Sequence, residues 1–182
     1  MYQDVIIAGF GGQGVLMAGK LLASAGMLEG RHVTWFPSYG AEIRGGTANC
    51  TVIISSEEIG SPVVRTPSAM LVLNEASYKK FENRIGQDGL LFLNTSLVHA
   101  APSRTDITRI DVRANDIAEQ LGDIRVANMV MLGAFLQKSC VVNLDSVLTA
   151  LRGVLPARRQ SLLPLNDRAL RRGAEICSEM PA

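Results

Sequence analysis

The sequence predicts one α/β domain over residues 1–182, with a Rossmann-like, mostly parallel sheet flanked by helices and a helical C-terminal third. Three observations predict this fold class. Short apolar runs alternate with longer segments of helical periodicity, as expected for a sheet covered by helices. The first run leads directly into the glycine-rich stretch "GFGGQG", residues 9–14, which is typical of a tight strand-to-helix turn. At 47% hydrophobic residues, the 182 residues suffice for one well-filled core but would leave two domains with thin cores.

The N-terminal segment is predicted to form a strand, a turn and a closely packed helix. Residues 5–8 are a continuous apolar run, as in a strand buried on both faces. Residues 13–30 have helical periodicity and end at Gly30, a residue type that favours the helix C-terminal cap. Gly19 and Gly26 are seven residues apart on one helical face, so this helix can lie close to the sheet. Together these elements form the first half of a βαβ unit.

The remaining elements continue the alternation of strands and helices. The segment "HVTWFPSYG" is predicted to be the second strand, stopped by Pro37. Further strands are predicted at residues 47–56, 69–74, 89–96 and 106–112, and helices at 75–85, 113–122, 126–139, 143–156 and 166–180. The last three helices make up the helical C-terminal third, in which the methionine- and leucine-rich stripe around Met129 is expected to belong to the core.

The charge of the chain argues against a nucleic-acid partner. The formal net charge is +1, from 18 basic and 17 acidic residues. The short pairs Arg158-Arg159 and Arg171-Arg172 are the densest basic clusters, and they are expected to be solvated helix faces. Proteins that bind duplexes concentrate basic residues on one face, so we expect no nucleic acid here.

The three cysteines, Cys50, Cys140 and Cys177, are far apart and none stands in a C-x-x-C pair. Structural zinc and iron–sulfur sites draw ligands in close pairs, so we expect this chain to bind no metal by itself. Scattered cysteines fit reduced, mostly buried thiols in a cytoplasmic protein, and Cys50 is expected to be a packed thiol of a strand. The sequence has neither the roughly 18-residue apolar run of a membrane span nor the basic start of a signal peptide, so no membrane contact is expected.

The glycine turn has the backbone chemistry of an anion site. Gly9 permits the tight turn, Gly11 and Gly12 have no Cβ to keep a ligand away, and Gly14 lets the helix approach the strand. The N–H groups and positive dipole end of the helix that begins near Gln13 favour an anion. The same glycines would also serve a close-packed turn without a ligand, and the pattern alone leaves both interpretations open.

A dinucleotide is not favoured as the ligand of this turn. NAD-binding folds place an acidic residue at the tip of the second strand, about 20 residues on, where it holds the ribose hydroxyls. Here that strand ends in "TWFPSYG", which contains neither a carboxylate nor an arginine suited to NADP.

The segment after the second strand is dense in hydrogen-bonding groups. We expect it to lie beside the glycine turn, because ligands of open α/β sheets bind outside the carboxyl ends of the strands. Arg44 offers a guanidinium fork suited to phosphate or carboxylate, and Glu42 would orient it. Alternatively, Glu42 and Arg44 pair with each other on the surface while the neighbouring glycines only turn the chain. The predicted ligand-contacting residues of the two segments are Gly11, Gly12, Gln13, Gly14, Ser38, Tyr39, Glu42, Arg44, Gly45, Gly46 and Thr47.

Taken together, "GFGGQGVLMAGKLLASAG" and "PSYGAEIRGGTANCTVIIS" resemble the gamma subunit of the 2-oxoacid:ferredoxin oxidoreductases. The resemblance extends over essentially the whole chain, and the pair "GGQG" and "EIRGG" is its specific part. The related indolepyruvate oxidoreductase subunit is also similar, but its second loop usually carries a methionine- and glutamine-containing version ahead of "RGG".

The resemblance implies a role inside a multi-subunit enzyme. Such complexes decarboxylate a 2-oxoacid on thiamine diphosphate with magnesium, pass electrons through iron–sulfur clusters to ferredoxin, and leave an acyl group on coenzyme A. The implied partners are alpha, beta and possibly delta subunits, which hold those cofactors. This chain would hold none alone and would be inactive in isolation. It would contribute assembly and part of the coenzyme A approach at the two loops, with Arg44 as a charge-assisted contact. Among the oxoacids we favour 2-oxoglutarate over pyruvate and branched-chain substrates.

No side chain is predicted to be a covalent or acid–base catalyst. His32 opens a strand and His99 lies in a polar loop, where structural roles are expected. Asn128, polar among apolar neighbours, is expected to cap or hydrogen-bond a loop. The alternatives are a stand-alone nucleotide- or flavin-binding oxidoreductase of Rossmann type, and a pure assembly module whose glycine loops contact only other subunits.

Overall fold

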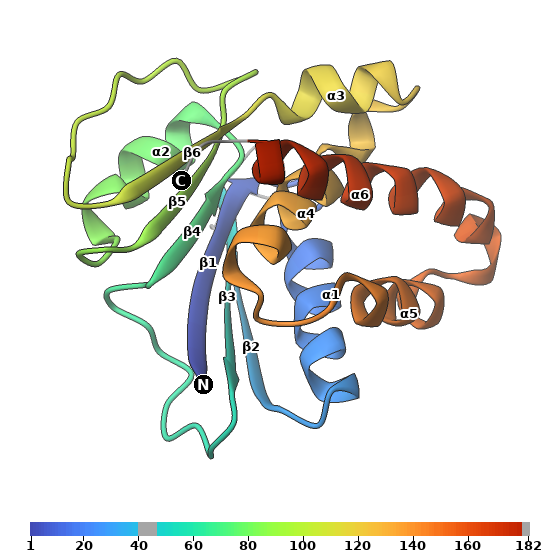
Figure 1. The fold of residues 1–182 in the computed structure, drawn as a ribbon, viewed down its shortest axis with the longest axis horizontal. Coiled ribbons are helices and arrows are strands. Elements are labelled where there is room, and N and C mark those ends of the chain that lie inside the picture. Colours follow the sequence, from blue (N-terminus) through green and yellow to red (C-terminus); the bar gives the residue numbers. More distant parts are fainter. Residues whose placement is uncertain (40–46, 180–182) are drawn as a thin grey trace.

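A mixed sheet with helices on both faces forms the domain in the computed structural model, which describes residues 1–39 and 47–179 (Figure 1). The strands are β1 (Tyr2–Phe10), β2 (His32–Tyr39), β3 (Thr47–Ser55), β4 (Ala69–Val72), β5 (Leu90–Asn94) and β6 (Thr108–Val112). The α-helices are α1 (Val15–Leu28), α2 (Glu75–Phe81), α3 (Ala114–Gln120), α4 (Ala127–Ser139), α5 (Leu144–Val154) and α6 (Leu163–Glu179). The α/β class and the helical C-terminal third are confirmed.

The strand order is β2-β3-β1-β4-β5-β6. Strands β4, β5 and β6 continue parallel from β1, whereas β3 is antiparallel to both β1 and β2. The sheet is therefore mostly parallel, as predicted. The expected βαβ unit is modified, because β3 lies between β1 and β2 and takes the place beside β1 that the second strand would otherwise fill.

The prediction that Pro37 stops the second strand is wrong. Strand β2 continues through Pro37 to Tyr39, and Pro37 stands opposite Cys50 of β3. Proline lacks the N–H of a ladder hydrogen bond, and that loss is tolerated on an edge strand. Because β2 is the end strand of the sheet, it is such an edge.

Helix α1 packs against the sheet as closely as its glycines predict. A Cβ added at Gly26 would lie 2.9 Å from Cγ2 of Val33, and one added at Gly19 would overlap the Cys50 sulfur. The helix ends at Leu28 with Glu29 as its C-terminal cap, slightly before the predicted end at Gly30, and Gly30 follows the cap with a φ of 72°, in the left-handed region that glycine adopts without strain.

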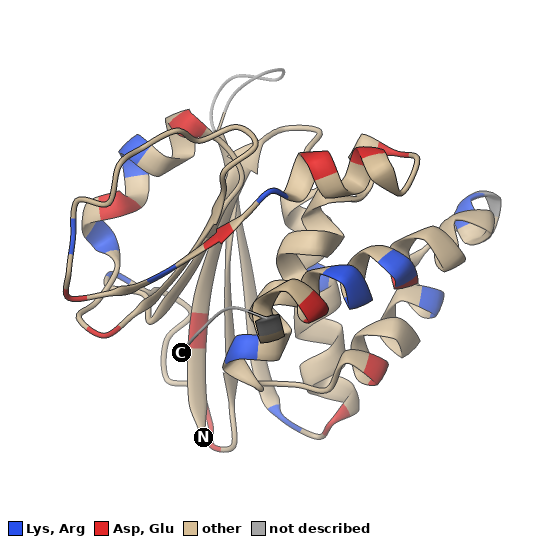
Figure 2. Cartoon of the chain, turned by 45° about the horizontal axis from the view of Figure 1, so that its top comes forward, with Lys and Arg blue, Asp and Glu red and all other residues tan. Residues whose placement is uncertain are grey.

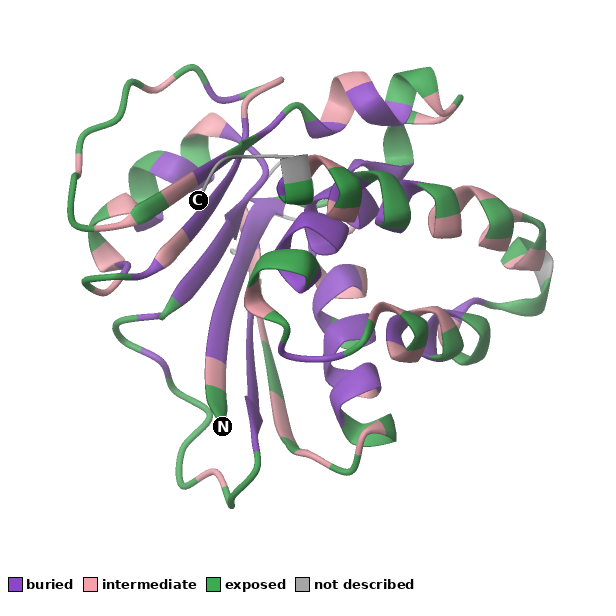
Figure 3. Ribbon diagram, in the orientation of Figure 1, coloured by how far each residue is buried: buried purple, intermediate pink, exposed green. Residues whose placement is uncertain are grey.

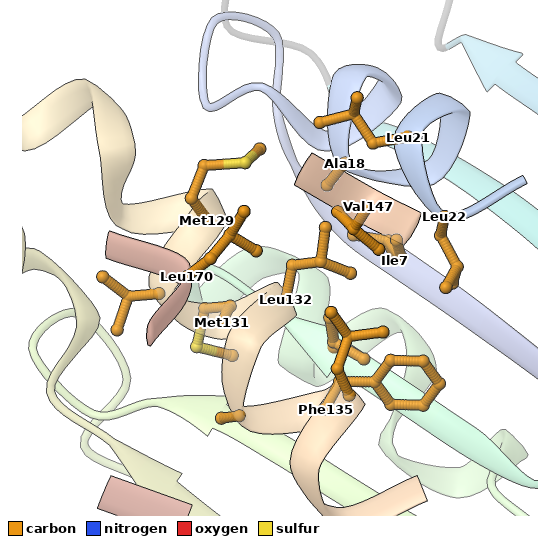
Figure 4. Packing of buried hydrophobic residues seen from close by; sticks show 14 of the residues in the cluster. Ile7, Ala18, Leu21, Leu22, Met129, Met131, Leu132, Phe135, Val147 and Leu170 are labelled. Atoms are coloured by element: carbon orange, nitrogen blue, oxygen red, sulfur yellow. The ribbon is translucent and has the colours of Figure 1, made fainter. Parts of the chain in front are cut away.

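The larger part of the core lies between one face of the sheet and helices α1, α3, α4, α5 and α6 (Figure 1). Helix α4 is buried from Ala127 to Leu136, and Met129, Met131 and Leu132 point into this core as expected (Figure 4). The rings of Phe92 on β5 and Phe135 on α4 meet edge to face, 5.7 Å apart.

The opposite face of the sheet is covered only in part. Its smaller core cluster joins residues of β1, β4 and β5 with Tyr78 and Phe81 of α2. Among the described residues, no member of this cluster comes from β2 or β3. Figure 3 shows the result, since β2 is exposed or half-buried along much of its length while β4 is buried. In the part of the chain that the structure describes, no helix is long and apolar enough to cross a membrane.

Candidate functional site

The glycine turn, the end of β2 and the start of β3 lie at the same edge of the sheet. Phe10, the last residue of β1, stands opposite Thr47, the first of β3. Ala48 stands between Gly9 and Tyr39, so β1 and β2 end side by side with β3 starting between them. The described ends of the second segment, at Ser38 and Thr47, thus lie beside the glycine turn, as expected.

Part of the predicted contact set lies outside the described residues. Glu42, Arg44, Gly45 and Gly46 fall there, and Tyr39 is described by its backbone alone. Their contribution to ligand binding stays a prediction.

The four glycines of the turn divide into two kinds. A Cβ on Gly9 would lie 2.7 Å from Oε1 of Gln13 and 2.8 Å from Cγ2 of Val15, and one on Gly14 would overlap the Asn128 amide. By contrast, a Cβ on Gly11 or Gly12 would meet no atom of the described residues within 4 Å. Gly9 and Gly14 are therefore needed for packing, whereas no described residue occupies the space in front of Gly11 and Gly12.

The open glycines carry free donors. Within the described part of the chain, the backbone N–H groups of Gly11 and Gly12 have no hydrogen-bond acceptor. Gly12 has a φ of 105°, which a residue with a side chain rarely adopts. Behind the turn begins α1, whose first N–H groups point out of the helix end and whose dipole favours negative charge. This arrangement suits a phosphate or carboxylate.

Gln13 holds the turn in place. Its Oε1 accepts hydrogen bonds from the backbone N–H of Phe10 (2.7 Å) and from Nδ2 of Asn74 (2.8 Å), while its Nε2 donates to the Leu73 carbonyl (3.4 Å). Its side-chain amide is thus committed within the protein, and Gln13 contributes to the site by shaping it.

The same amide network continues along the carboxyl edge of the sheet. Asn94, fully buried, donates to the Leu73 carbonyl (3.2 Å) and to Oδ1 of Asn115 (2.9 Å). Asn74 caps α2 by accepting a hydrogen bond from the Ser77 N–H (2.8 Å). Sequence reasoning missed this network, although Asn74 and Asn94 each end an apolar strand, which is a signal that a buried amide is needed there.

Asn128 anchors the turn from the other side. Its Nδ2 donates to the Gly14 carbonyl (3.1 Å), and the side chain is 6% exposed. The expectation that Asn128 hydrogen-bonds a loop is confirmed. Because α4 is buried in the core, this bond fixes the position of the turn relative to the rest of the domain.

A lysine that sequence reasoning did not select also reaches this edge. Lys80 of α2 donates from Nζ to Oγ1 of Thr47 (3.3 Å). Its neighbour Lys79 pairs instead with Glu75 on the same helix (3.4 Å). In Figure 2 the charges gather on helices and connecting segments, while the central strands are almost entirely uncharged.

The described residues provide no catalytic constellation. His32 is the first residue of β2, and His99 lies after β5. Burial raises the pKa of the Cys50 thiol to about 12, despite hydrogen bonds with Trp35 and Gly19 that lower it, so this thiol stays protonated. Across residues 1–39 and 47–179, no three His, Cys, Asp or Glu side chains are grouped to hold a metal. We assign no magnesium–diphosphate cofactor chemistry to the described residues.

The chain is similar to known proteins over nearly its whole length. The family model described as pyruvate ferredoxin/flavodoxin oxidoreductase matches residues 4–176. The chain is 39% identical, over 96% of its length, to the ketoisovalerate oxidoreductase subunit VorA of Methanothermobacter thermautotrophicus, and it spans only 36% of that relative. It is 31% identical to the 2-oxoglutarate synthase subunit KorC of Methanocaldococcus jannaschii, covering 99% of this chain and 96% of that one.

The fold has a solved counterpart. The crystal structure of a keto/oxoacid ferredoxin oxidoreductase gamma subunit from Geobacter sulfurreducens matches with a TM-score of 0.84 and 27% identity. The match covers 98% of this chain and 99% of that one, so the two share the whole domain, helical C-terminal third included.

Proposed function

The chain belongs to the pyruvate ferredoxin/flavodoxin oxidoreductase family as a gamma-type subunit, and we propose from this premise that it works in a multi-subunit 2-oxoacid:ferredoxin oxidoreductase. The complex would oxidatively decarboxylate a 2-oxoacid to an acyl-CoA and reduce ferredoxin. Thiamine diphosphate with magnesium and iron–sulfur clusters, which we assign to alpha, beta and possibly delta subunits, would supply the decarboxylation and electron transfer. The complex is expected to be cytoplasmic.

The part we assign to this chain is a share of the coenzyme A approach. One observation supports it: among the described residues, nothing packs against Gly11 and Gly12 and nothing accepts a hydrogen bond from their N–H groups, at the end of β1. Coenzyme A carries phosphate anions, which backbone N–H groups at a helix start bind well. Ser38 and Thr47, on the strands beside the turn, add hydroxyl groups, and Arg44 would add a guanidinium.

A role next to other modules is supported by the lengths of the relatives. The region similar to this chain makes up about a third of VorA but nearly all of KorC. The same module thus occurs both as part of a longer polypeptide and as a separate polypeptide, as expected of a subunit that packs against a neighbouring one. A stand-alone nucleotide- or flavin-binding oxidoreductase is not favoured. Because VorA and KorC are named for different 2-oxoacids, the preference for 2-oxoglutarate stays a prediction.

Gly11 offers the sharpest test, because no packing in the described structure requires glycine there. In the assembled complex, Gly11→Leu would place a side chain where the ligand must pass. The Michaelis constant for coenzyme A in oxoacid-dependent ferredoxin reduction should rise at least about tenfold, which corresponds to about 1.4 kcal/mol. The constant for the oxoacid should not change. Calorimetric titration of coenzyme A without oxoacid measures the same loss apart from turnover.

The matched control is Gly60→Leu, since Gly60 is also exposed, faces open space and lies in a different segment. A Gly11→Leu complex that assembles normally and binds coenzyme A as tightly as the control would refute ligand contact and leave assembly as the role of the turn. Separately, an unchanged Michaelis constant for coenzyme A in Arg44→Ala would remove Arg44 from the site.

A further inference from the structure

On the sheet face that α2 covers, the ends of β2 and β3 next to the glycine turn carry polar side chains, whereas Thr51, Ile53 and Ser55 farther along β3 are buried. Alternate residues of a strand point to the same face, and residues opposite in register share it. Ile6 and Ala8 of β1 point into the cluster under α2, so their partners in register, Thr51 and Asn49 of β3, face the same way. Asn49 in turn stands opposite Ser38 of β2.

The other face of these strands supports this assignment. Cys50 and Trp35, which alternate with the residues just named, lie against Gly19 of α1. Asn49 and Ser38 therefore point away from α1, toward the side where β2 and β3 contribute nothing to a core cluster. Asn49 is half-buried and Ser38 exposed.

The side chain of Lys80 reaches from α2 to the start of β3. It belongs to α2, the helix that covers β1, β4 and β5, yet its ammonium reaches Thr47 Oγ1 of β3 (3.3 Å). Thr47 pairs with Phe10, one residue before Gly11. The charge of Lys80 is thus held directly beside the open end of the turn.

The hydrogen-bonding capacity of this surface is largely unused. Within the described residues, the side chains of Ser38 and Asn49 make no hydrogen bond, and Lys80 forms no ion pair, whereas Lys79 pairs with Glu75. The acidic side chain in the next rows of this face, Asp4, is buried and accepts hydrogen bonds from Ser68 instead. Among the described residues, this surface therefore offers one cation, two hydroxyls and an amide, and no described carboxylate is paired with that cation.

We propose that Ser38, Thr47, Asn49 and Lys80 form a phosphate-binding patch for the nucleotide end of coenzyme A, the end remote from the reactive thiol. This inference rests on the proposed function and extends it from the turn to the open sheet face. Lys80 contacts a phosphate, and the hydroxyl and amide groups contact the phosphate oxygens or the sugar. The phosphate is either the 3′-phosphomonoester or the diphosphate of the coenzyme, which share this chemistry.

The test uses the assembled complex with Lys80→Met, which keeps the aliphatic stem and removes the charge. Lys79→Met is the matched control, since Lys79 is adjacent on α2 and paired with Glu75. Affinities for coenzyme A and for dephospho-coenzyme A, which lacks the 3′-phosphate, are measured by calorimetry without oxoacid. We expect Lys80→Met to weaken coenzyme A binding about tenfold, as for loss of a charge-assisted hydrogen bond, and Lys80→Arg to restore most of it. The control should bind like the wild type.

The outcomes separate the two sources of phosphate and the two proposals. Loss confined to coenzyme A identifies the 3′-phosphate, and equal loss for both ligands identifies the diphosphate. Unchanged affinity in Lys80→Met, with Gly11→Leu still impaired, overturns the patch while the proposed function stands. Unchanged affinity in both variants overturns both.

Discussion

The crossing of α4 and α6 provides the strictest test of the packing. Gly133 of α4 faces the backbone of Leu170, and Gly173 of α6 faces the backbone of Val130. A Cβ on Gly133 would lie 2.8 Å from the carbonyl carbon and 3.1 Å from the Cα of Leu170, and closer still to the carbonyl oxygen. These are backbone atoms within a helix, so they cannot move aside singly. Gly133→Ala therefore forces α6 away from α4 as a unit.

The cost follows from the geometry. Overpacking in a core typically costs about 1–3 kcal/mol, and a clash with backbone belongs at the upper end. Alanine regains about 1 kcal/mol through its helix preference, which leaves a net loss of about 2 kcal/mol. Gly153 of α5 is the matched control, because it is helical and exposed and an added Cβ would meet open space. Gly153→Ala should stabilise the domain by about 0.5–1 kcal/mol.

Urea unfolding of the purified chain, followed by far-ultraviolet circular dichroism, measures both free energies. In a thermal scan, a domain of this size changes its midpoint by about 2–4 °C per kcal/mol, so Gly133→Ala should melt about 4–8 °C lower than the wild type. Gly173→Ala should behave like Gly133→Ala. If Gly133→Ala were instead as stable as Gly153→Ala, the close approach of the two helices would be wrong.

Two further predictions concern titratable groups. Burial acts to raise the pKa of Glu29, but hydrogen bonds from Ser146 and Asn143 leave it below the usual 4.5. The ionised Glu29 side chain therefore stabilises the folded state above about pH 4.5, and this contribution is lost as the pH falls through the folded-state pKa. The unfolding midpoints of the wild type and Glu29→Gln should differ near pH 7 and converge in acid, and a constant difference would contradict this. Cys140 is exposed whereas Cys50 is buried with a pKa of about 12, so a thiol reagent at about pH 8 should modify Cys140 rapidly and Cys50 only on unfolding. Cys140→Ser should abolish the rapid phase, and labelling of Cys50 in the folded chain would refute the packing around it.

The elements of this fold were predictable because their signals are local. Apolar runs mark the strands, and Gly30 marks the end of α1. Strand order was less accessible, because it depends on pairings between distant segments. One overlooked signal was the connection between β2 and β3 at residues 40–46. It is too short for the crossover of a dozen or more residues that adjacent parallel strands need, so it implies the antiparallel pairing observed.

The site was predictable only as far as its backbone. Consecutive glycines in a strand-to-helix turn indicate room for a ligand, and no described residue packs against Gly11 or Gly12. The pattern could not assign Gln13 to the interior, because its partner Asn74 lies 61 residues away in sequence. The pattern also could not predict the contact between Lys80 and Thr47, which are 33 residues apart in the sequence. Both contacts exist because β4 and α2 return beside β1, which is a property of the sheet and not of either local motif.

Strand β3, which lies between β1 and β2, gives a second reason, beside the missing carboxylate, why the dinucleotide pattern does not apply here. In a dinucleotide fold the second strand adjoins the first, so an acidic residue at its tip meets the ribose. Here β3 separates them, and the tip of β2 lies two strand spacings, roughly 10 Å, from β1. A carboxylate added at that tip would not restore a ribose contact. The position beside the turn belongs instead to Thr47, with Lys80 above it. In the proposed function, a ligand whose phosphate binds the turn would therefore meet the hydroxyl of Thr47 and the ammonium of Lys80 at the start of β3, and not a residue of β2.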